Sequence, residues 1–360
     1  MSERLSLLED FIARAGWGDA KRSPITGDAS TRSYQRLLRG ADKAVLMNAP
    51  KGEEAPGERE GASVAERRAL GYNALARLAG PNLEAFLCVA QELTRRGFSA
   101  PHILAADTNY GFALLEDFGD ADFASVLRAD PAQERTLYEA AVDTLAAIYR
   151  STFPRRPDWR GQGWWLRDYD EAALLAETDL FIDYYVPDSG QPVSDTARDE
   201  FRAVWRTAFK ALGAHASGLA LRDFHAENLF WLPDRERQAK VGLIDFQDAL
   251  FAHPAYDLVS LLEDARRDVS DALHAPLKQR FCDAAGLPCD EAFNAAYAVQ
   301  AAQRNAKILG IFVRLVVRDG KPKYRRLIPR VKAHFQRDLM HPACAGIRAW
   351  CETHCPEVLA

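Results

Sequence analysis

Hydrophobic and polar positions alternate early in the chain, a pattern typical of half-buried strands. Residues 20–50 hold two such stretches, ITGDASTRSYQRLLRG and KAVLMNAP. Gly27 and Asp28 supply turn chemistry inside the first stretch, and Pro50 ends the second. Ahead of them, apolar residues at helical spacing predict a short helix. Its packed face would hold Leu5, Leu8, Phe11 and Ile12.

The next segment predicts helices and then two further strands. VAERRALGYNALARLAG is helical in pattern, which indicates a helical insert near residues 56–80. PNLEAFLCVAQELTRRGF predicts a second helix, with Pro81 near its start and Gly97 just past its end. APHILAAD and GFALLEDFGD predict two strands joined by a hairpin turn at residues 109–111.

Helical patterns dominate after residue 120, with one exception. Residues 217–249 read as two short strands around a polar turn. A strand-rich beginning and a helix-rich remainder indicate an α+β chain. We place the boundary near residue 118, with one part at 1–118 and the other at 119–360.

Composition limits the classes of function. The chain has 360 residues, 48% of them hydrophobic and 27% charged, with a net charge of −5. A mildly acidic chain of this kind is not expected to bind nucleic acid or a membrane surface. No apolar run approaches the roughly 18 residues of a membrane span, and the N-terminus does not resemble a signal peptide. We therefore expect a cytoplasmic protein, and we expect it to be a monomer.

Six cysteines do not form a disulfide scaffold in a chain of this length. The segment HPACAGIRAWCETHC gathers three of them with two histidines, so a zinc site is one alternative. The segment lacks a C-x-x-C pair, and Ile347 and Trp350 mark an apolar helix face. We expect buried or surface thiols there instead of a metal site.

The stretch LRDFHAENLFW carries the candidate chemistry. Neither G-x-x-x-x-G-K-S/T nor G-x-G-x-x-G occurs, so phosphate would be held in another way. Asp223 and Asn228 are spaced like the acid and amide of the kinase loop H-R-D-x-x-x-x-N, and Asp245 ends an apolar strand as in D-F-G. Phosphoryl transfer needs a base or orienting group and oxygen ligands for Mg²⁺. Each residue alone could be a turn former, but the ordered set predicts a kinase.

The same stretches resemble the aminoglycoside phosphotransferase and choline kinase superfamily. LRDFHAENL is similar to its H-G-D-x-H-x-x-N loop, and LIDFQDALFAHPAYDLVSLL is similar to its metal-binding strand end and following helix. GDASTRSYQRL, VLMNAP, LLEDFGD and QRNAKILGIFVRL resemble the bacterial anomeric kinases of N-acetylmuramate and N-acetylglucosamine, which serve cell-wall recycling. The resemblance implies a two-lobed protein-kinase-like fold, with a β-rich N-lobe and a mainly helical C-lobe. It also implies ATP and Mg²⁺ as cofactors.

The resemblance assigns roles to the catalytic residues. It implies that Asp223 acts on the acceptor hydroxyl and that Asn228 and Asp245 hold Mg²⁺. Leu221 stands where the superfamily has a histidine, and we expect altered packing without loss of chemistry. The role of His225 has three alternatives: a general base, packing of the loop, and contact with phosphate or substrate.

The nucleotide site departs from the superfamily at the third strand. Met47 and Asn48 occupy the position of a phosphate-binding lysine, while Lys43 and Lys51 are expected to face solvent. Arg32 is the first candidate for the missing cation and Arg36 the second, although both could be surface residues. Glu84 and Glu92 are both open as the helix acid that pairs with such a cation. The other predicted nucleotide contacts are Asp28, Ser30, Glu116 and Phe118.

The acceptor site is predicted from two helical segments. Glu177 resembles the acid of the anomeric-kinase branch, although it could instead lie on a solvated helix face. Arg304 could pair with the lactyl carboxylate of N-acetylmuramate. The alternatives are a kinase of another hydroxyl acceptor, such as an aminoglycoside or amino alcohol, and a nucleotide-binding pseudokinase that regulates a partner.

Overall fold

A computed structural model describes the chain except for residues 1–2, 26–31, 52–56 and 58–59. The predicted turn at Gly27 and Asp28 and the candidate Ser30 therefore lie outside the described residues. The chain forms two compact units. Unit 1 comprises Met1–Thr144, Ser151–Arg167 and Ala226–Ala249, and unit 2 comprises Leu145–Arg150, Asp168–His225 and Leu250–Ala360. The boundary near residue 118 concerns a hinge between lobes and stays a prediction.

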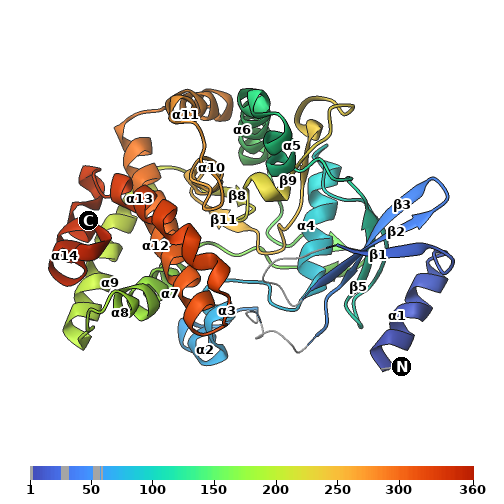
Figure 1. Cartoon of the computed structure of the whole chain (residues 1–360), viewed down its shortest axis with the longest axis horizontal. Coiled ribbons are helices and arrows are strands. Elements are labelled where there is room, and N and C mark those ends of the chain that lie inside the picture. The colour runs from blue at the N-terminus through green and yellow to red at the C-terminus, as the bar shows by residue number, and fades with distance from the viewer. Residues whose placement is uncertain (1–2, 26–31, 52–56, 58–59) are drawn as a thin grey trace. The chain divides into compact units, whose positions relative to one another are not determined.

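Unit 1 contains a five-stranded antiparallel sheet in the order β1-β2-β3-β5-β4, of which Figure 1 labels β1, β2, β3 and β5. Its strands are β1 (Lys21–Ile25), β2 (Ser33–Arg39), β3 (Asp42–Asn48), β4 (Ile103–Asp107) and β5 (Phe112–Glu116). The predicted hairpin turn joins β4 to β5, with Gly111 at a φ of 72°. Only glycine fits there, because a Cβ atom would lie 1.9 Å from the Ala49 carbonyl oxygen.

The predicted N-terminal helix is α1 (Glu3–Arg14), which packs on the sheet. Its residues Leu8, Phe11 and Ile12 are buried in a cluster with sheet residues that include Phe112. The prediction for Leu5 is wrong, since its side chain is 40% exposed. Leu5 lies in the first turn of α1, and the buried cluster begins one turn later.

The helical insert contains two short helices, α2 (Val64–Leu70) and α3 (Tyr72–Leu75), where the pattern predicted one. The break falls at Gly71, whose φ of 104° is incompatible with a continuous helix. The next predicted helix is confirmed as α4 (Leu83–Arg95), and Gly97 follows it at a φ of 79°.

Two small hairpins are the other strand pairs among the described residues of unit 1. They pair β6 (Asp158–Trp159) with β7 (Gln162–Gly163), and β9 (Leu229–Trp231) with β10 (Val241–Leu243). α5 (Phe123–Ala129) belongs to this unit, and α6 (Glu134–Arg150) runs from unit 1 into unit 2.

Unit 2 is mainly helical, as predicted. Its helices of eight residues or more are α7 (Glu171–Leu180), α9 (Asp195–Phe209), α10 (Ala255–Leu262), α11 (Asp271–Ala285), α12 (Glu291–Val317), α13 (Ile328–Asp338) and α14 (Ala345–His354). A single turn, α8 (Val186–Asp188), follows a π-helical segment at Phe181–Tyr185. None of the described helices is long and apolar enough to cross a membrane.

Helix α12 lies at the centre of the unit 2 core. It packs with α7, α13 and the π-helical segment, and Gly310 lets it approach closely, because a Cβ there would lie 2.3 Å from the Leu180 backbone. Cys344, Cys351 and Cys355 belong to the same apolar cluster, so of the buried or surface thiols expected there, these three are buried. Among the described residues, no group of three or more His, Cys, Asp or Glu side chains has a metal-binding arrangement.

The stretch 217–249 contains three strands where two were predicted. β9 and β10 are the predicted pair, and the additional strand β8 (Gly218–Ala220) pairs with β11 (Leu250–Ala252) in unit 2. Strands of three fully or mostly buried residues carry no alternation, so the pattern could not reveal them.

Candidate active site

The loop that begins at Leu221 is anchored by a buried carboxylate. Asp257, in the first turn of α10, accepts hydrogen bonds from the backbone N–H of Leu221 at 2.6 Å and of Arg222 at 2.9 Å. Burial raises the pKa of Asp257 to about 7, against the opposing effect of these two hydrogen bonds. Leu221 itself is buried, so an apolar side chain fills the place of the superfamily histidine.

Glu177 is the centre of a second buried network beneath this loop in unit 2. Its carboxylate pairs with Arg222, lies 2.8 Å from Lys307 Nζ, and accepts hydrogen bonds from Tyr169 and Gln303. Burial alone would raise the pKa of Glu177, but the charges of Lys307 and Arg222 outweigh it and hold the pKa below its ordinary value. The side chain is fully buried, which favours support of the loop; sugar contact stays a prediction.

Asp223 and His225 follow on the same loop. Asp223 is half-buried, and its carbonyl accepts a hydrogen bond from the His225 N–H at 3.2 Å. The His225 ring is buried, with Nε2 3.5 Å from Arg266 Nη1. The guanidinium contact agrees with loop packing or phosphate contact, and the role of His225 stays a prediction.

The predicted metal ligands meet at one end of the β9–β10 hairpin in unit 1. Because Leu229 pairs with Leu243, Asn228 and Asp245 leave their strands side by side. Asn228 Nδ2 lies 3.3 Å from Asp245 Oδ2, and Gln247 Nε2 donates to Asp245 Oδ1 at 2.9 Å. The structure therefore brings together the two side chains that the sequence assigns to Mg²⁺, and their role as metal ligands stays a prediction.

Packing fixes the segment that follows Asp245. The Phe246 ring stacks on Phe86 of α4, with ring centroids 4.9 Å apart. Asp248 accepts a hydrogen bond from the Ala79 N–H at 2.7 Å. These contacts tie the segment after the strand to α4 and to the helical insert, and Asp245, with a φ of 61°, stands directly before it.

Glu116 and Phe118, the predicted hinge contacts, are both engaged by Arg235. The Arg235 guanidinium pairs with Glu116 and lies 5.2 Å from the centre of the Phe118 ring. Glu116 Oε2 also accepts the His102 N–H at 3.2 Å. The side chains are thus occupied within unit 1, and adenine binding by the nearby backbone stays a prediction.

Arg32 and Arg36, the two candidates for the phosphate-binding cation, have different partners. Arg32 Nη2 donates to the Gly80 carbonyl at 3.2 Å. Arg36 pairs with two carboxylates, Asp117 at 2.7 Å and Asp120 at 2.8 Å. Two ion pairs disfavour Arg36 as a phosphate ligand, whereas Arg32 stays a prediction.

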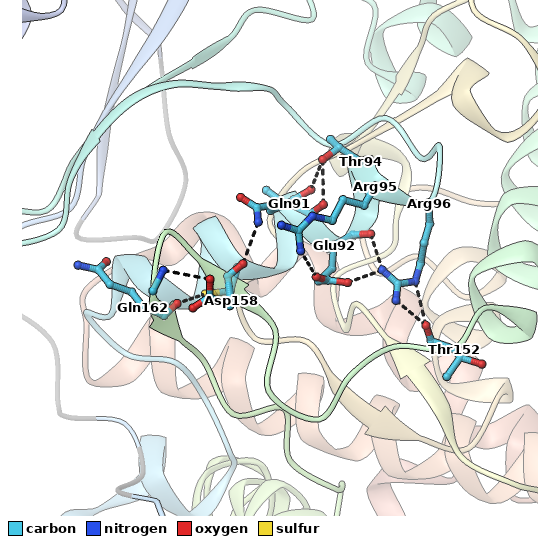
Figure 2. A network of polar contacts seen from close by, with 11 residues as sticks. Gln91, Glu92, Thr94, Arg95, Arg96, Thr152, Asp158 and Gln162 are labelled. Carbon is cyan, nitrogen blue, oxygen red and sulfur yellow. Dashed lines mark hydrogen bonds and ion pairs between the residues drawn. The ribbon is translucent and has the colours of Figure 1, made fainter.

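Lys51 contributes a possibility that pattern reasoning set aside. Its Nζ lies 3.9 Å from Glu84 Oε1, although its side chain is 46% exposed. Glu92 is held instead by Arg95 and Arg96 on its own side of α4 (Figure 2). The sequence offered Glu84 and Glu92 as the helix acid that pairs with a phosphate-binding cation. Of these two, Glu84 is the one that lies beside a lysine, Lys51, which follows β3.

The acceptor candidate Arg304 is buried in unit 2, where Nη2 donates to Ser260 Oγ at 2.6 Å. Its role as a carboxylate ligand stays a prediction. Pattern reasoning missed a cavity in unit 1 that includes Trp164, Trp165 and Arg167 among its lining. The adjacent tryptophans and following arginine of GWWLR were the available signal.

Comparison with known proteins decides the family. The model of the phosphotransferase enzyme family matches residues 21–293, more than half of the chain. The chain belongs to this family. Solved structures of its fold include a choline/ethanolamine kinase family protein from Mesorhizobium loti (TM-score 0.55, 15% identity, 96% of this chain and 98% of that one). Another is the GDP complex of aminoglycoside 2′-phosphotransferase-IIIa (TM-score 0.56, 15% identity, 92% and 99%). They confirm the predicted α+β, protein-kinase-like fold.

Curated relatives of this phosphotransferase are more similar in sequence. An N-acetylmuramate/N-acetylglucosamine kinase from Caulobacter vibrioides is 42% identical over 99% of this chain and 98% of its own. A protein of the same name from Pseudomonas aeruginosa is 30% identical over 90% of this chain and 86% of its own.

Proposed function

We propose that this phosphotransferase is an ATP-dependent anomeric kinase of N-acetylmuramate, N-acetylglucosamine or both. The observation that carries the proposal is the 42% identity to a kinase of these sugars over nearly the full length of both chains. The convergence of Asn228 and Asp245 and the anchored loop before Asp223 agree with it.

The proposed reaction is a direct phosphoryl transfer in which Asp223 acts on the acceptor hydroxyl. The sugar C1 hydroxyl attacks the γ-phosphorus of ATP, a new P–O bond forms, and the bond to the bridging oxygen of ADP breaks. Asp223 orients the hydroxyl and accepts its proton. The products are a sugar 1-phosphate and ADP.

Asn228 and Asp245 are the residues that would hold Mg²⁺. The Asp245 carboxylate and the Asn228 side chain, whose amide nitrogen lies 3.3 Å from that carboxylate, carry the hard oxygen ligands that this ion prefers. Bound Mg²⁺ would neutralise charge on the β- and γ-phosphates. Gln247 fixes the carboxylate orientation through its hydrogen bond to Asp245.

The test is coupled ADP release over a panel of the two sugars, an aminoglycoside and an amino alcohol. Asp223→Asn is expected to lower kcat by about 10²–10⁴-fold, because the general base is lost while the amide keeps the shape. Glu227→Gln, at an exposed acid of the same loop, is the matched control and should retain activity.

Two outcomes would contradict the proposal in different ways. Turnover of the aminoglycoside or amino alcohol without turnover of either sugar would replace the acceptor. Equal ADP release by the wild type and Asp223→Asn, at the rate measured without acceptor, would favour a nucleotide-binding regulator. The cytoplasmic location and the monomeric state stay predictions.

A further inference from the structure

A cavity of about 150 Å³ lies wholly within unit 1. Three segments that are distant in the sequence line it, and their polar and aromatic members are Glu60, Arg77, Trp164, Trp165, Arg167 and Gln247. None of the first five has a role in the site described above. The cavity is smaller than the roughly 300–1,000 Å³ of sites for drug-sized ligands, so it suits one small ring better than a multi-ring antibiotic.

The cavity lies one side chain away from the proposed metal ligands. Gln247 forms part of its wall and also donates to Asp245 Oδ1 at 2.9 Å. The neighbouring Asp248 accepts the Ala79 N–H at 2.7 Å, which holds the segment carrying Arg77 against the same strand end. A molecule in this cavity is therefore close to the place where the phosphates are expected.

The hairpin that precedes Trp164 and Trp165 is held to α4 by hydrogen bonds. Gln91 Nε2 donates to the Asp158 carbonyl at 2.9 Å, and Cys88 Sγ donates to the Gln162 carbonyl at 3.0 Å. Figure 2 shows Gln91 reaching Asp158, with Gln162 on the facing strand of the β6–β7 hairpin. The Trp164 N–H then donates to the Pro157 carbonyl at 2.9 Å. The aromatic side chains thus follow a hairpin fixed at several points.

The chemistry of the lining matches an anionic sugar. Indole rings offer flat faces to the C–H groups of a sugar ring and an N–H donor to its hydroxyls. Arg77 and Arg167 supply guanidinium groups to the lining, and Glu60 supplies a carboxylate. The Arg167 guanidinium lies 5.5 Å from the Trp165 ring centre, which orients a planar donor beside the aromatic face. Arginine forks bind carboxylates through two parallel hydrogen bonds.

We infer that this cavity binds the acceptor sugar, with Trp164 and Trp165 against the ring and Arg77 and Arg167 on a carboxylate substituent. The inference rests on the proposed sugar kinase function and names its acceptor class: an N-acetyl amino sugar that carries a carboxylate, as N-acetylmuramate does. In this inference the carboxylate binds Arg77 of the helical insert and Arg167 after β7. These residues take the role that the sequence had suggested for Arg304 of α12.

The kinetic test compares N-acetylmuramate with N-acetylglucosamine, which lacks the carboxylate. Arg77→Gln and Arg167→Gln should each raise KM for N-acetylmuramate at least tenfold more than KM for N-acetylglucosamine. Arg167→Lys keeps the charge and should recover part of the loss. Arg160→Gln is the matched control. Arg160 is an exposed arginine in the turn between β6 and β7, and it does not line the cavity.

A binding test without ATP separates this inference from the proposed function. Tryptophan emission of the wild type should change on titration with N-acetylmuramate, and Trp165→Phe should reduce that change. Thermal unfolding of each variant checks that it folds. If the wild type phosphorylates these sugars but the arginine variants shift both KM values equally, the carboxylate assignment is wrong. If neither sugar is phosphorylated, the proposed function fails, and the emission titration alone decides whether the cavity binds the sugar.

Discussion

At the scale of single residues, two positions of the proposed site hold strained backbone. Arg222 has a φ of 75° and Asp245 a φ of 61°, values that non-glycine residues rarely adopt. Such residues cost about 1–3 kcal/mol each and persist where their surroundings determine the conformation. Here Asp257 holds the Arg222 N–H and Gln247 holds the Asp245 carboxylate, so both turns aim side chains in set directions.

Glu177→Gln tests whether this buried acid supports the loop or binds the sugar. Removing its charge takes a carboxylate partner from the buried Arg222 and the partly buried Lys307, so we expect about 3–5 kcal/mol lower free energy of unfolding. Urea unfolding measures the change. Glu171→Gln on the same helix is the control, because its ion pair with Arg206 is exposed and should contribute under about 1 kcal/mol. A raised sugar KM with unchanged stability would instead support direct sugar contact.

At the scale of elements, helix α10 depends on a neutral histidine. His253 Nδ1 accepts the Ala255 N–H at 3.1 Å at the start of the helix, and its Nε2 lies 3.1 Å from His215 Nδ1. Burial, and then the charge of His215, lowers the pKa of His253 to about 3. The helix that carries Asp257 is thus capped by a ring that stays uncharged above that pH.

This cap predicts acid sensitivity of folding. Between pH 6.5 and about 3 the unfolded state binds a proton at His253 and the folded state does not, so the free energy of unfolding falls as the pH falls. One such group contributes a slope of up to about 1.4 kcal/mol per pH unit. Urea unfolding from pH 7 to 4.5 should show a smaller slope for His253→Asn, whose amide oxygen can still accept the Ala255 N–H. The exposed His102→Asn should leave the slope unchanged, and equal slopes for all three proteins would contradict the cap.

At the scale of the whole molecule, ligand binding adds to stability by mass action. A ligand that binds only the folded chain stabilises it by about 2.7 kcal/mol at a concentration 100 times its Kd. For this phosphotransferase, that stabilisation should depend on the residues proposed to hold Mg²⁺.

Thermal unfolding with a non-hydrolysable ATP analogue measures this dependence. We expect Mg²⁺ to raise the analogue's effect on Tm in the wild type and to add little in Asp245→Asn. Asp234→Asn is the control, because Asp234 is an exposed acid in the turn of the β9–β10 hairpin. If Mg²⁺ raised Tm equally in Asp245→Asn and in the wild type, Asp245 would not be a Mg²⁺ ligand.

The sequence by itself determined the features that depend on local patterns. Alternation and turn residues predicted the β4–β5 hairpin, and helical periodicity with Gly97 predicted α4. Strand pairing is local at the β9–β10 hairpin too, so Asn228 and Asp245 could be expected to meet. The resemblance of the same stretches then supplied the family.

Only the tertiary structure decided which side chains are buried and what they contact. Glu177, predicted on a sugar site or a solvated face, is enclosed by Arg222 and Lys307, because segments far apart in the chain fold around it. The β8–β11 pair is too short to show a period. The tryptophan cavity joins three distant segments, and no single segment carries its pattern. Burial and charge pairing arise from such long-range contacts, whereas periodicity reports only on neighbours along the chain.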